Sequence, residues 1–117
     1  YSAASHHSIG AQEIAKMKPT ATLVNIARGG IMDDAALALA LKNKQIAAAG
    51  LDVFESEPSV YPDLLTLPNV VLTPHIASST VKTRLAMAQL AADNLVSFFA
   101  SGHALTPLNQ VAATSAT

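Results

Sequence analysis

Three short apolar runs and one long helical stripe dominate the pattern of hydrophobic and polar positions along the chain. The runs cover residues 22–26, 47–54 and 70–72 and are separated by stretches that contain Pro, Gly, Asn or charged residues. Short, nearly continuous apolar runs bounded in this way are typical of buried strands in a parallel sheet. The pattern therefore predicts an α/β fold with a parallel sheet.

One helical pattern lies before the first of these strands, and another lies between the first and the second. Ile14, Met17 and the neighbouring Ala residues predict a short helix that ends before Pro19. Asp33 and Asp34 precede an Ala- and Leu-rich segment that has Lys42 and Lys44 at its end. This charge pattern matches the helix macrodipole and predicts a second helix over residues 34–43. Residues 55–67 contain two prolines and predict a loop, so the second and third strands are joined without a full helix.

The long stripe predicts a helix over residues 79–101. Its apolar positions recur at steps of four and three: Val81, Leu85, Ala88, Ala92, Leu95 and Phe99. Charged and amide side chains interrupt the apolar surface, which excludes a transmembrane span. Further apolar residues lie off the stripe, so we expect this helix to pack between two domains or two subunits, and we expect homodimerisation or self-association through it.

The composition limits the partners and the chemistry. Hydrophobic residues make up 50% of the 117 positions and aromatic ones only 4%, so the core is expected to be aliphatic. The net charge is -1 and the seven Lys and Arg are scattered, which argues against nucleic acid and membrane surfaces as partners. Cysteine is absent, which excludes a thiolate nucleophile and is compatible with a cytoplasmic location.

Histidine spacing gives no reason to expect a metal. The four His residues fit neither the helical nor the hairpin spacing of known metal ligands. The adjacent His6 and His7 are predicted to lie on a solvated loop. We therefore expect no metal site.

Three polar side chains follow the three predicted strands. Arg28 lies in LVNIARGG, Glu57 in AGLDVFESEP and His75 in VVLTPHIASS. The carboxyl ends of parallel strands meet at one edge of a sheet, where ligands bind. The topology therefore predicts that a cation, a carboxylate and an imidazole share one cleft.

These three residue types suit a 2-oxo or 2-hydroxy acid. A guanidinium matches a carboxylate and a neighbouring carbonyl oxygen, which is the role expected of Arg28. His75 can give a proton to the reduced oxygen, or take one in the oxidative direction. Glu57 would fix the tautomer of the imidazole and favour its charged form. Taken singly, each residue has a plain alternative: a surface ion pair, a loop histidine and a solvated loop acid.

The strings NIARGGIMDDAALALALKNKQIAAAGLDVFESEP and LPNVVLTPHIASST resemble the C-terminal signature regions of the D-isomer-specific 2-hydroxyacid dehydrogenase family. The resemblance implies that Arg28 binds the substrate carboxylate and carbonyl, that Glu57 orients the histidine, and that His75 is the acid and base. It implies that Asp52 contacts the nicotinamide carboxamide. Backbone near these positions would line the nicotinamide pocket: Ile26, Ala27, Ala77 and Ser78.

The resemblance also implies a domain plan and a cofactor. Residues 1–107 would form the C-terminal half of a domain that binds NAD or NADP, with NADP slightly favoured, and would contain the second half of a Rossmann-type doubly wound parallel sheet with a long C-terminal helix. Residues 108–117, which end in a run of Ala, Ser and Thr with nothing to bury, are predicted to form a disordered tail. No G-x-G-x-x-G phosphate loop occurs in these residues, so the isolated chain is expected to be inactive.

The HIASST and LTPLN strings resemble most the glyoxylate, hydroxypyruvate and 2-ketogluconate reductase branch of the family. An oxidoreductase that acts on a small 2-oxo or 2-hydroxy acid is therefore expected. Two alternatives remain at this point. Corepressors that resemble these dehydrogenases keep the three polar residues, and an inactive remnant of the domain would keep them as well.

Overall fold

A computed structural model describes residues 1–109 of the chain. The chain divides into two compact units, Tyr1–Ala77 and Ser78–Thr117. The first unit opens with a short 3-10 helix, η1 (Ala3–Ser5), and contains all the strands of the described residues. Because the units are distinct, we describe each by itself.

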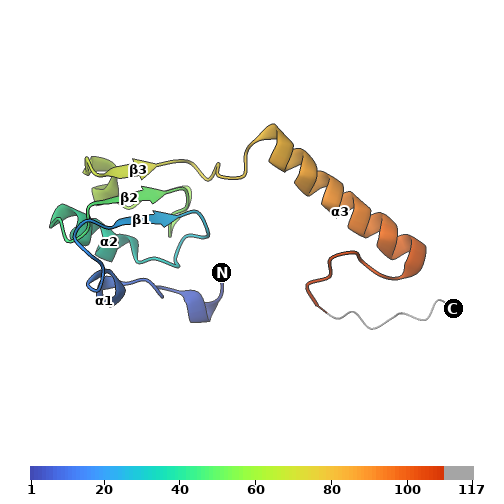
Figure 1. Ribbon diagram of the computed structural model, residues 1–117, viewed down its shortest axis with the longest axis horizontal. Helices are drawn as coiled ribbons and strands as arrows, with labels where there is room; N and C mark the ends of the chain where they lie inside the picture. The colour runs from blue at the N-terminus through green and yellow to red at the C-terminus, as the bar shows by residue number, and fades with distance from the viewer. Residues whose placement is uncertain (110–117) are drawn as a thin grey trace. The chain divides into compact units, whose positions relative to one another are not determined.

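The first unit is built on a parallel sheet of three strands. These are β1 (Thr22–Asn25), β2 (Ala48–Leu51) and β3 (Val70–Leu72), and β2 lies between the other two. Figure 1 shows the three arrows side by side and pointing the same way. The predicted α/β fold with a parallel sheet is confirmed. β2 is shorter than the predicted run 47–54. The Asp52 N–H still donates to the Asn25 carbonyl at the end of β1, and after this bond the chain leaves the sheet.

Two α-helices of this unit lie where the sequence predicted them, one before β1 and one between β1 and β2. They are α1 (Ala11–Ile14) and α2 (Asp34–Lys42), which contact each other. The side chain of Asp33 accepts a hydrogen bond from the Ala36 N–H at 2.9 Å and so caps α2. The predicted loop 55–67 contains a 3-10 helix that the sequence pattern did not predict, η2 (Pro62–Thr66), with its Pro in the first turn, where a missing N–H does no harm.

The core lies on one face of the sheet. The buried aliphatic side chains come mainly from α1, α2, β2 and η2: Ile14, Leu37, Leu41, Ile46, Leu51 and Leu64. The opposite face is open in this unit, since Val24 and Val71 are 64% and 68% exposed and flank Gly50 in the register. The low aromatic content is therefore matched by an aliphatic core, as the composition predicted.

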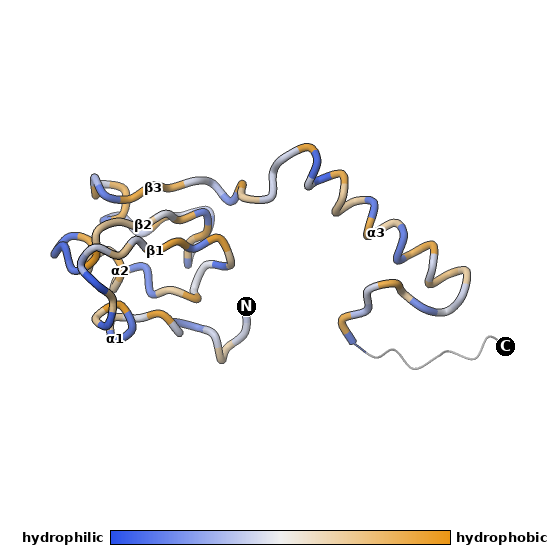
Figure 2. The backbone as a smooth tube through the Cα atoms, viewed as in Figure 1, coloured by the Kyte–Doolittle hydropathy of each residue, from blue (hydrophilic) through white to orange (hydrophobic). Residues whose placement is uncertain are grey.

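The second unit consists mainly of the long helix α3 (Val81–Ser101). The Thr80 side chain caps its start by accepting from the Thr83 N–H, and Gly102 ends it with a φ of 76°, which glycine adopts readily. Figure 2 shows hydrophobic and hydrophilic residues alternating along α3. The predicted helix is confirmed to within two residues at its start. None of the residues of α3 is buried. The described residues of this unit therefore do not include the surface against which the apolar stripe of α3 is expected to pack.

The chain after α3 folds back along the last turns of the helix. The Thr106 N–H donates to Asn94 Oδ1 at 2.9 Å, and the Asn94 amide donates to the Thr106 hydroxyl at 3.0 Å. No helix within residues 1–109 is both long enough and apolar enough to cross a membrane. Most of the predicted tail, from residue 110 on, lies outside the described residues.

Candidate active site

The three polar residues that the sequence singled out lie together at the carboxyl edge of the sheet. Arg28 follows β1, Glu57 lies in the loop after β2, and His75 follows β3. All three line one open hollow of about 640 Å³, which we call the strand-end hollow. The parallel topology thus brings the predicted cation, carboxylate and imidazole into one place, as expected for the ligand edge of such a sheet.

A direct hydrogen bond joins Glu57 and His75. Glu57 Oε2 lies 2.9 Å from His75 Nδ1, and Glu57 Oε1 accepts from the Phe54 N–H at 3.0 Å. These bonds, the one from His75 foremost, lower the pKa of Glu57 below its ordinary value, so the carboxylate is held in its charged form. With Nδ1 turned to Glu57, His75 keeps Nε2 for a ligand.

The loop that carries His75 is fixed by a buried carboxylate. Asp52, only 4% exposed, accepts from the Thr73 hydroxyl at 2.6 Å, the Ile76 N–H at 2.8 Å and the Ala77 N–H at 2.9 Å. These partners stand on both sides of His75, whose φ of 54° is unusual for a residue with a Cβ. The Thr73 hydroxyl first, and then the two N–H groups, lower the pKa of Asp52 despite its burial.

A buried amide fixes the loop that carries Arg28. Asn25 Oδ1 accepts from the Ala27 N–H at 3.1 Å, and Asn25 Nδ2 donates to the Arg28 carbonyl at 3.1 Å. The Arg28 guanidinium itself is exposed, and its Nη1 donates to the Ala27 carbonyl at 2.7 Å. Within residues 1–109 its other N–H groups make no hydrogen bond, so they are free to bind an anion. Asn25 belongs to the same LVNIARGG string as Arg28, but its position inside the predicted strand gave no sign of this role.

The residues that the resemblance assigns to the nicotinamide pocket differ in their exposure and in their hydrogen bonds. Ile26, Ala27 and Ala77 are exposed residues, but the N–H groups of Ala27 and Ala77 already donate to Asn25 and Asp52. Ser78 belongs to the second unit. Asp52 holds the His75 loop, a role that the sequence did not reveal. Within residues 1–109 its Oδ2 accepts one hydrogen bond, from the Ala77 N–H, so this oxygen keeps a second lone pair although the side chain is largely buried. That acceptor fits the carboxamide N–H of a nicotinamide.

Two residues far from any strand also line the strand-end hollow. They are Tyr1 and His6, and the Tyr1 hydroxyl lies 2.6 Å from His6 Nδ1. The sequence carries no signal for them, because neither follows a strand nor belongs to a motif.

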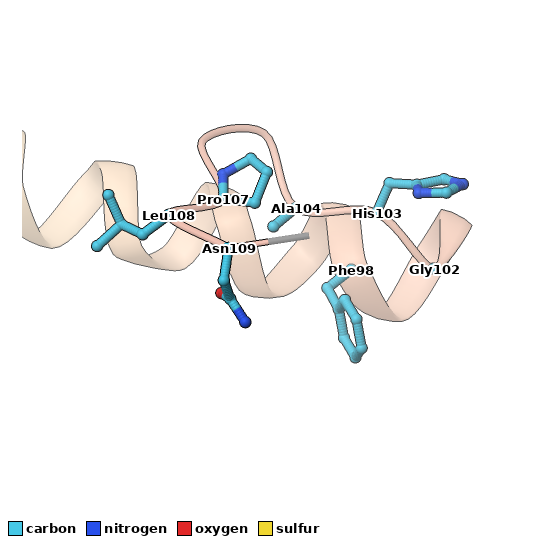
Figure 3. A pocket seen from close by; sticks show the side chains of 7 residues that line it. All are labelled: Phe98, Gly102, His103, Ala104, Pro107, Leu108 and Asn109. Atoms are coloured by element: carbon cyan, nitrogen blue, oxygen red, sulfur yellow. The ribbon is translucent and has the colours of Figure 1, made fainter. Parts of the chain in front are cut away.

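A second hollow, of about 430 Å³, lies in the second unit where the chain folds back on the end of α3 (Figure 3). Phe98, Leu108 and other residues of this unit line it, and none of the three strand-end residues contributes. Among the described residues, its lining is mainly apolar and offers no acid, base or cation besides the ring of His103. The chemistry therefore points to the strand-end hollow.

An Asp52→Asn variant is expected to be less stable than the original chain at neutral pH. One carboxylate oxygen becomes an NH₂ group, which cannot accept from the backbone N–H groups that Asp52 now binds. Because folding lowers the pKa of Asp52, its contribution is full above the ordinary value of about 3.8 and is lost as the pH falls through the folded value. The difference in unfolding free energy between the original chain and Asp52→Asn should therefore narrow below pH 3.8. Urea unfolding at a series of pH values measures it.

Asp63→Asn is the matched control, since Asp63 is exposed and its carboxylate makes no hydrogen bond within residues 1–109. The raised pKa of the buried Asp34 acts in all three proteins and cancels in the comparison. The lowered pKa of Glu57 is set mainly by His75 and the Phe54 N–H, which all three proteins keep, and the Asp52 charge is the last of its causes. If the difference in unfolding free energy between the original chain and Asp52→Asn stays constant or widens in acid, the role given to Asp52 is contradicted.

A parallel α/β sheet with a carboxylate–histidine pair and an arginine at its carboxyl edge defines the ligand-binding part of a doubly wound domain. The family model described as "D-isomer specific 2-hydroxyacid dehydrogenase, NAD binding domain" matches residues 1–77. The chain therefore belongs to the D-isomer-specific 2-hydroxyacid dehydrogenase family.

Individual relatives agree with this assignment. Glyoxylate/hydroxypyruvate reductase B of Enterobacter agglomerans is 57% identical over 96 residues, which cover 81% of this chain and 30% of the relative. 2-Ketogluconate reductase of Gluconobacter oxydans is 56% identical over 86 residues, covering 74% of this chain and 28% of the relative.

Among solved structures, the NADPH-dependent glyoxylate/hydroxypyruvate reductase of Sinorhizobium meliloti in complex with NADP and malonate is 48% identical. It superposes with a TM-score of 0.86 over 92% of this chain and 34% of that one. The chain thus spans about a third of the length of its relatives. These relatives are reductases, so the corepressor alternative is not favoured.

Proposed function

We propose that this chain supplies the acid–base half of the active site of a cytoplasmic reductase that acts on a small 2-oxo acid such as glyoxylate or hydroxypyruvate. The observation that carries the proposal is the hydrogen bond between Glu57 and His75 in a hollow that Arg28 also lines. The 57% identity to a glyoxylate/hydroxypyruvate reductase supports the substrate class.

Each residue has a definite task in this proposal. The free guanidinium N–H groups of Arg28 bind the substrate carboxylate and polarise the neighbouring carbonyl. A bound nicotinamide supplies the hydride that reduces the carbonyl carbon. His75 donates the proton from Nε2 to the carbonyl oxygen, while Glu57 holds Nδ1 and stabilises the charged ring. In the direction of oxidation, His75 takes the proton from the hydroxyl.

We favour NADP over NAD as the cofactor, because the related Sinorhizobium meliloti reductase is NADPH-dependent and its structure contains NADP. Asp52 Oδ2 and the backbone of Ile26 and Ala27 would hold the carboxamide end. The residues that contact the adenosine phosphates are not proposed among these 117, because no G-x-G-x-x-G string occurs in them.

A chimera tests the function. Residues 1–107 replace the matching segment of the Enterobacter agglomerans reductase, and NADPH oxidation is followed with glyoxylate and with hydroxypyruvate. We expect turnover with both acids, and none from the 117-residue chain alone. A chimera that folds, as judged by circular dichroism and by NADPH binding, but does not turn over either acid would contradict the proposal. Comparing NADH with NADPH tests the cofactor preference.

We also propose that the chain self-associates through α3. Its exposed apolar side chains include Leu85, Leu95 and Phe99, with exposed fractions of 66%, 60% and 83%. Burying such surface against a second copy is favourable by about 25 cal/mol per Å². Sedimentation velocity should show a dimer that dissociates on dilution, and the double variant Leu95→Gln, Phe99→Gln should be a monomer. A monomer at every concentration of the original chain would contradict the proposal.

A further inference from the structure

A group of metal-ligating side chains lies beside the three strand-end residues and has no part in the proposed reaction. One ligand atom from each of His6, His7 and Glu55 lies within 4.8 Å of the other two. The His7 Nε2 atom is 2.7 Å from Glu55 Oε1, and the rings of His6 and His7 stack with centroids 3.8 Å apart. Two imidazoles and a carboxylate are the ligand set of many zinc sites.

The backbone that presents these ligands is held in place. His7 has a φ of 49°, which brings two neighbouring rings together although adjacent side chains normally diverge. Its N–H donates to the Gly30 carbonyl at 2.8 Å and so fixes this turn. The Glu55 N–H donates at 3.0 Å to Asp34, a carboxylate that is only 4% exposed. This conformation explains why spacing alone predicted no metal site.

The second nitrogen of each histidine faces an oxygen. His6 Nδ1 lies 2.6 Å from the Tyr1 hydroxyl, and His7 Nδ1 lies 3.9 Å from Asp33 Oδ2. A hydrogen-bonded oxygen such as the Tyr1 hydroxyl orients a metal-bound histidine and raises its basicity. The Asp33 carboxylate, at 3.9 Å, is too distant for a hydrogen bond and acts on His7 through its charge. Three acidic residues, Asp33, Asp34 and Glu55, also make the neighbourhood attractive to a cation.

We propose that His6, His7 and Glu55 form a binding site for one Zn²⁺ or similar divalent transition-metal ion at the rim of the strand-end hollow. The bound ion ties the loop of residues 1–10 to the loop after β2, which also carries Glu57. The site is separate from the Glu57–His75 pair and does not depend on the proposed reaction.

Metal binding requires a defined rearrangement. Two ligand atoms of a tetrahedral zinc ion lie roughly 3.4 Å apart, given metal–ligand distances of about 2.1 Å. A spacing of 4.8 Å therefore has to close by about 1.4 Å, and the 2.7 Å contact between His7 Nε2 and Glu55 Oε1 has to lengthen by about 0.7 Å. The two rings, now inclined by only 22°, have to open so that both lone pairs point at one ion. We therefore expect the rings of His6 and His7 to separate when the ion binds.

Zinc titration of the tag-free 117-residue chain against a chromophoric chelator tests the site. We expect one equivalent of Zn²⁺ to bind at micromolar concentration, with separate resonances of the His6 and His7 rings shifting in NMR spectra. His6→Asn and Glu55→Gln should each weaken binding by at least about tenfold. Both side chains are exposed, so these variants should fold, which circular dichroism verifies.

Two further variants show where the ion binds. His103→Asn, in the second unit, and His75→Gln, in the Glu57 pair, should both leave the zinc affinity unchanged. Saturating zinc should raise the thermal midpoint of the original chain but not that of Glu55→Gln. The proposal is overturned if no zinc binds at micromolar concentration, if binding survives in both His6→Asn and Glu55→Gln, or if His75→Gln abolishes it.

Discussion

A Gly29→Ala variant is expected to lose about 3 kcal/mol or more of unfolding free energy. A Cβ at Gly29 would lie 1.7 Å from the Phe54 carbonyl oxygen and 2.3 Å from its carbonyl carbon. Both are backbone atoms, so no rotation of a side chain relieves the overlap, and one of the two loops has to move. Because the Phe54 N–H holds Glu57, that movement also disturbs the Glu57–His75 pair. Urea unfolding of the purified chain measures the loss.

Gly50→Ala is the matched control for this prediction. A Cβ at Gly50 meets only Val24 Cγ2, at an ordinary 3.8 Å. Replacing a strand glycine by alanine reduces the freedom of the unfolded chain, so this variant should be equally stable or more stable by about 0.5–1 kcal/mol. A Gly29→Ala protein that unfolds at the same urea concentration as the original would show that the two loops do not pack as described.

His75→Gln is expected to lower the kcat of the chimeric reductase by about 10²–10⁴-fold, the usual contribution of a general acid. Glutamine keeps a polar side chain of similar length but cannot deliver a proton to the carbonyl oxygen near neutral pH. The KM for glyoxylate should change much less, since Arg28 still binds the carboxylate. Steady-state kinetics with NADPH separate the two effects.

Glu57→Gln and His103→Gln complete the comparison. Glu57→Gln removes the negative charge that faces His75 Nδ1 and holds the ring in place, so we expect a loss of kcat that is smaller than the loss in His75→Gln. His103→Gln replaces a histidine of the second unit that the proposed reaction does not use, and it should leave the rate unchanged. Near-normal turnover by His75→Gln would rule out the proposed acid and base.

Much of the fold could be predicted because its signals are local. The apolar run that became β3 ended where predicted, and the acidic start and basic end of α2 matched its dipole. Pro62–Thr66 was missed as a 3-10 helix, since a short helix inside a Pro-containing loop leaves no periodic pattern. The meeting of Arg28, Glu57 and His75 was predictable as well, because parallel topology alone places strand ends at one edge.

The sequence by itself therefore determined the class of fold, the family and the three strand-end residues of the candidate site. Only the tertiary structure decided how that site is held: Asn25 under the Arg28 loop, Asp52 under the His75 loop, and Gly29 against the Phe54 backbone. It alone also brought His6 and His7 to Glu55. Periodicity and charge act over a few residues along the chain, whereas these contacts depend on loop conformations, such as the positive φ of His75, that only packing selects.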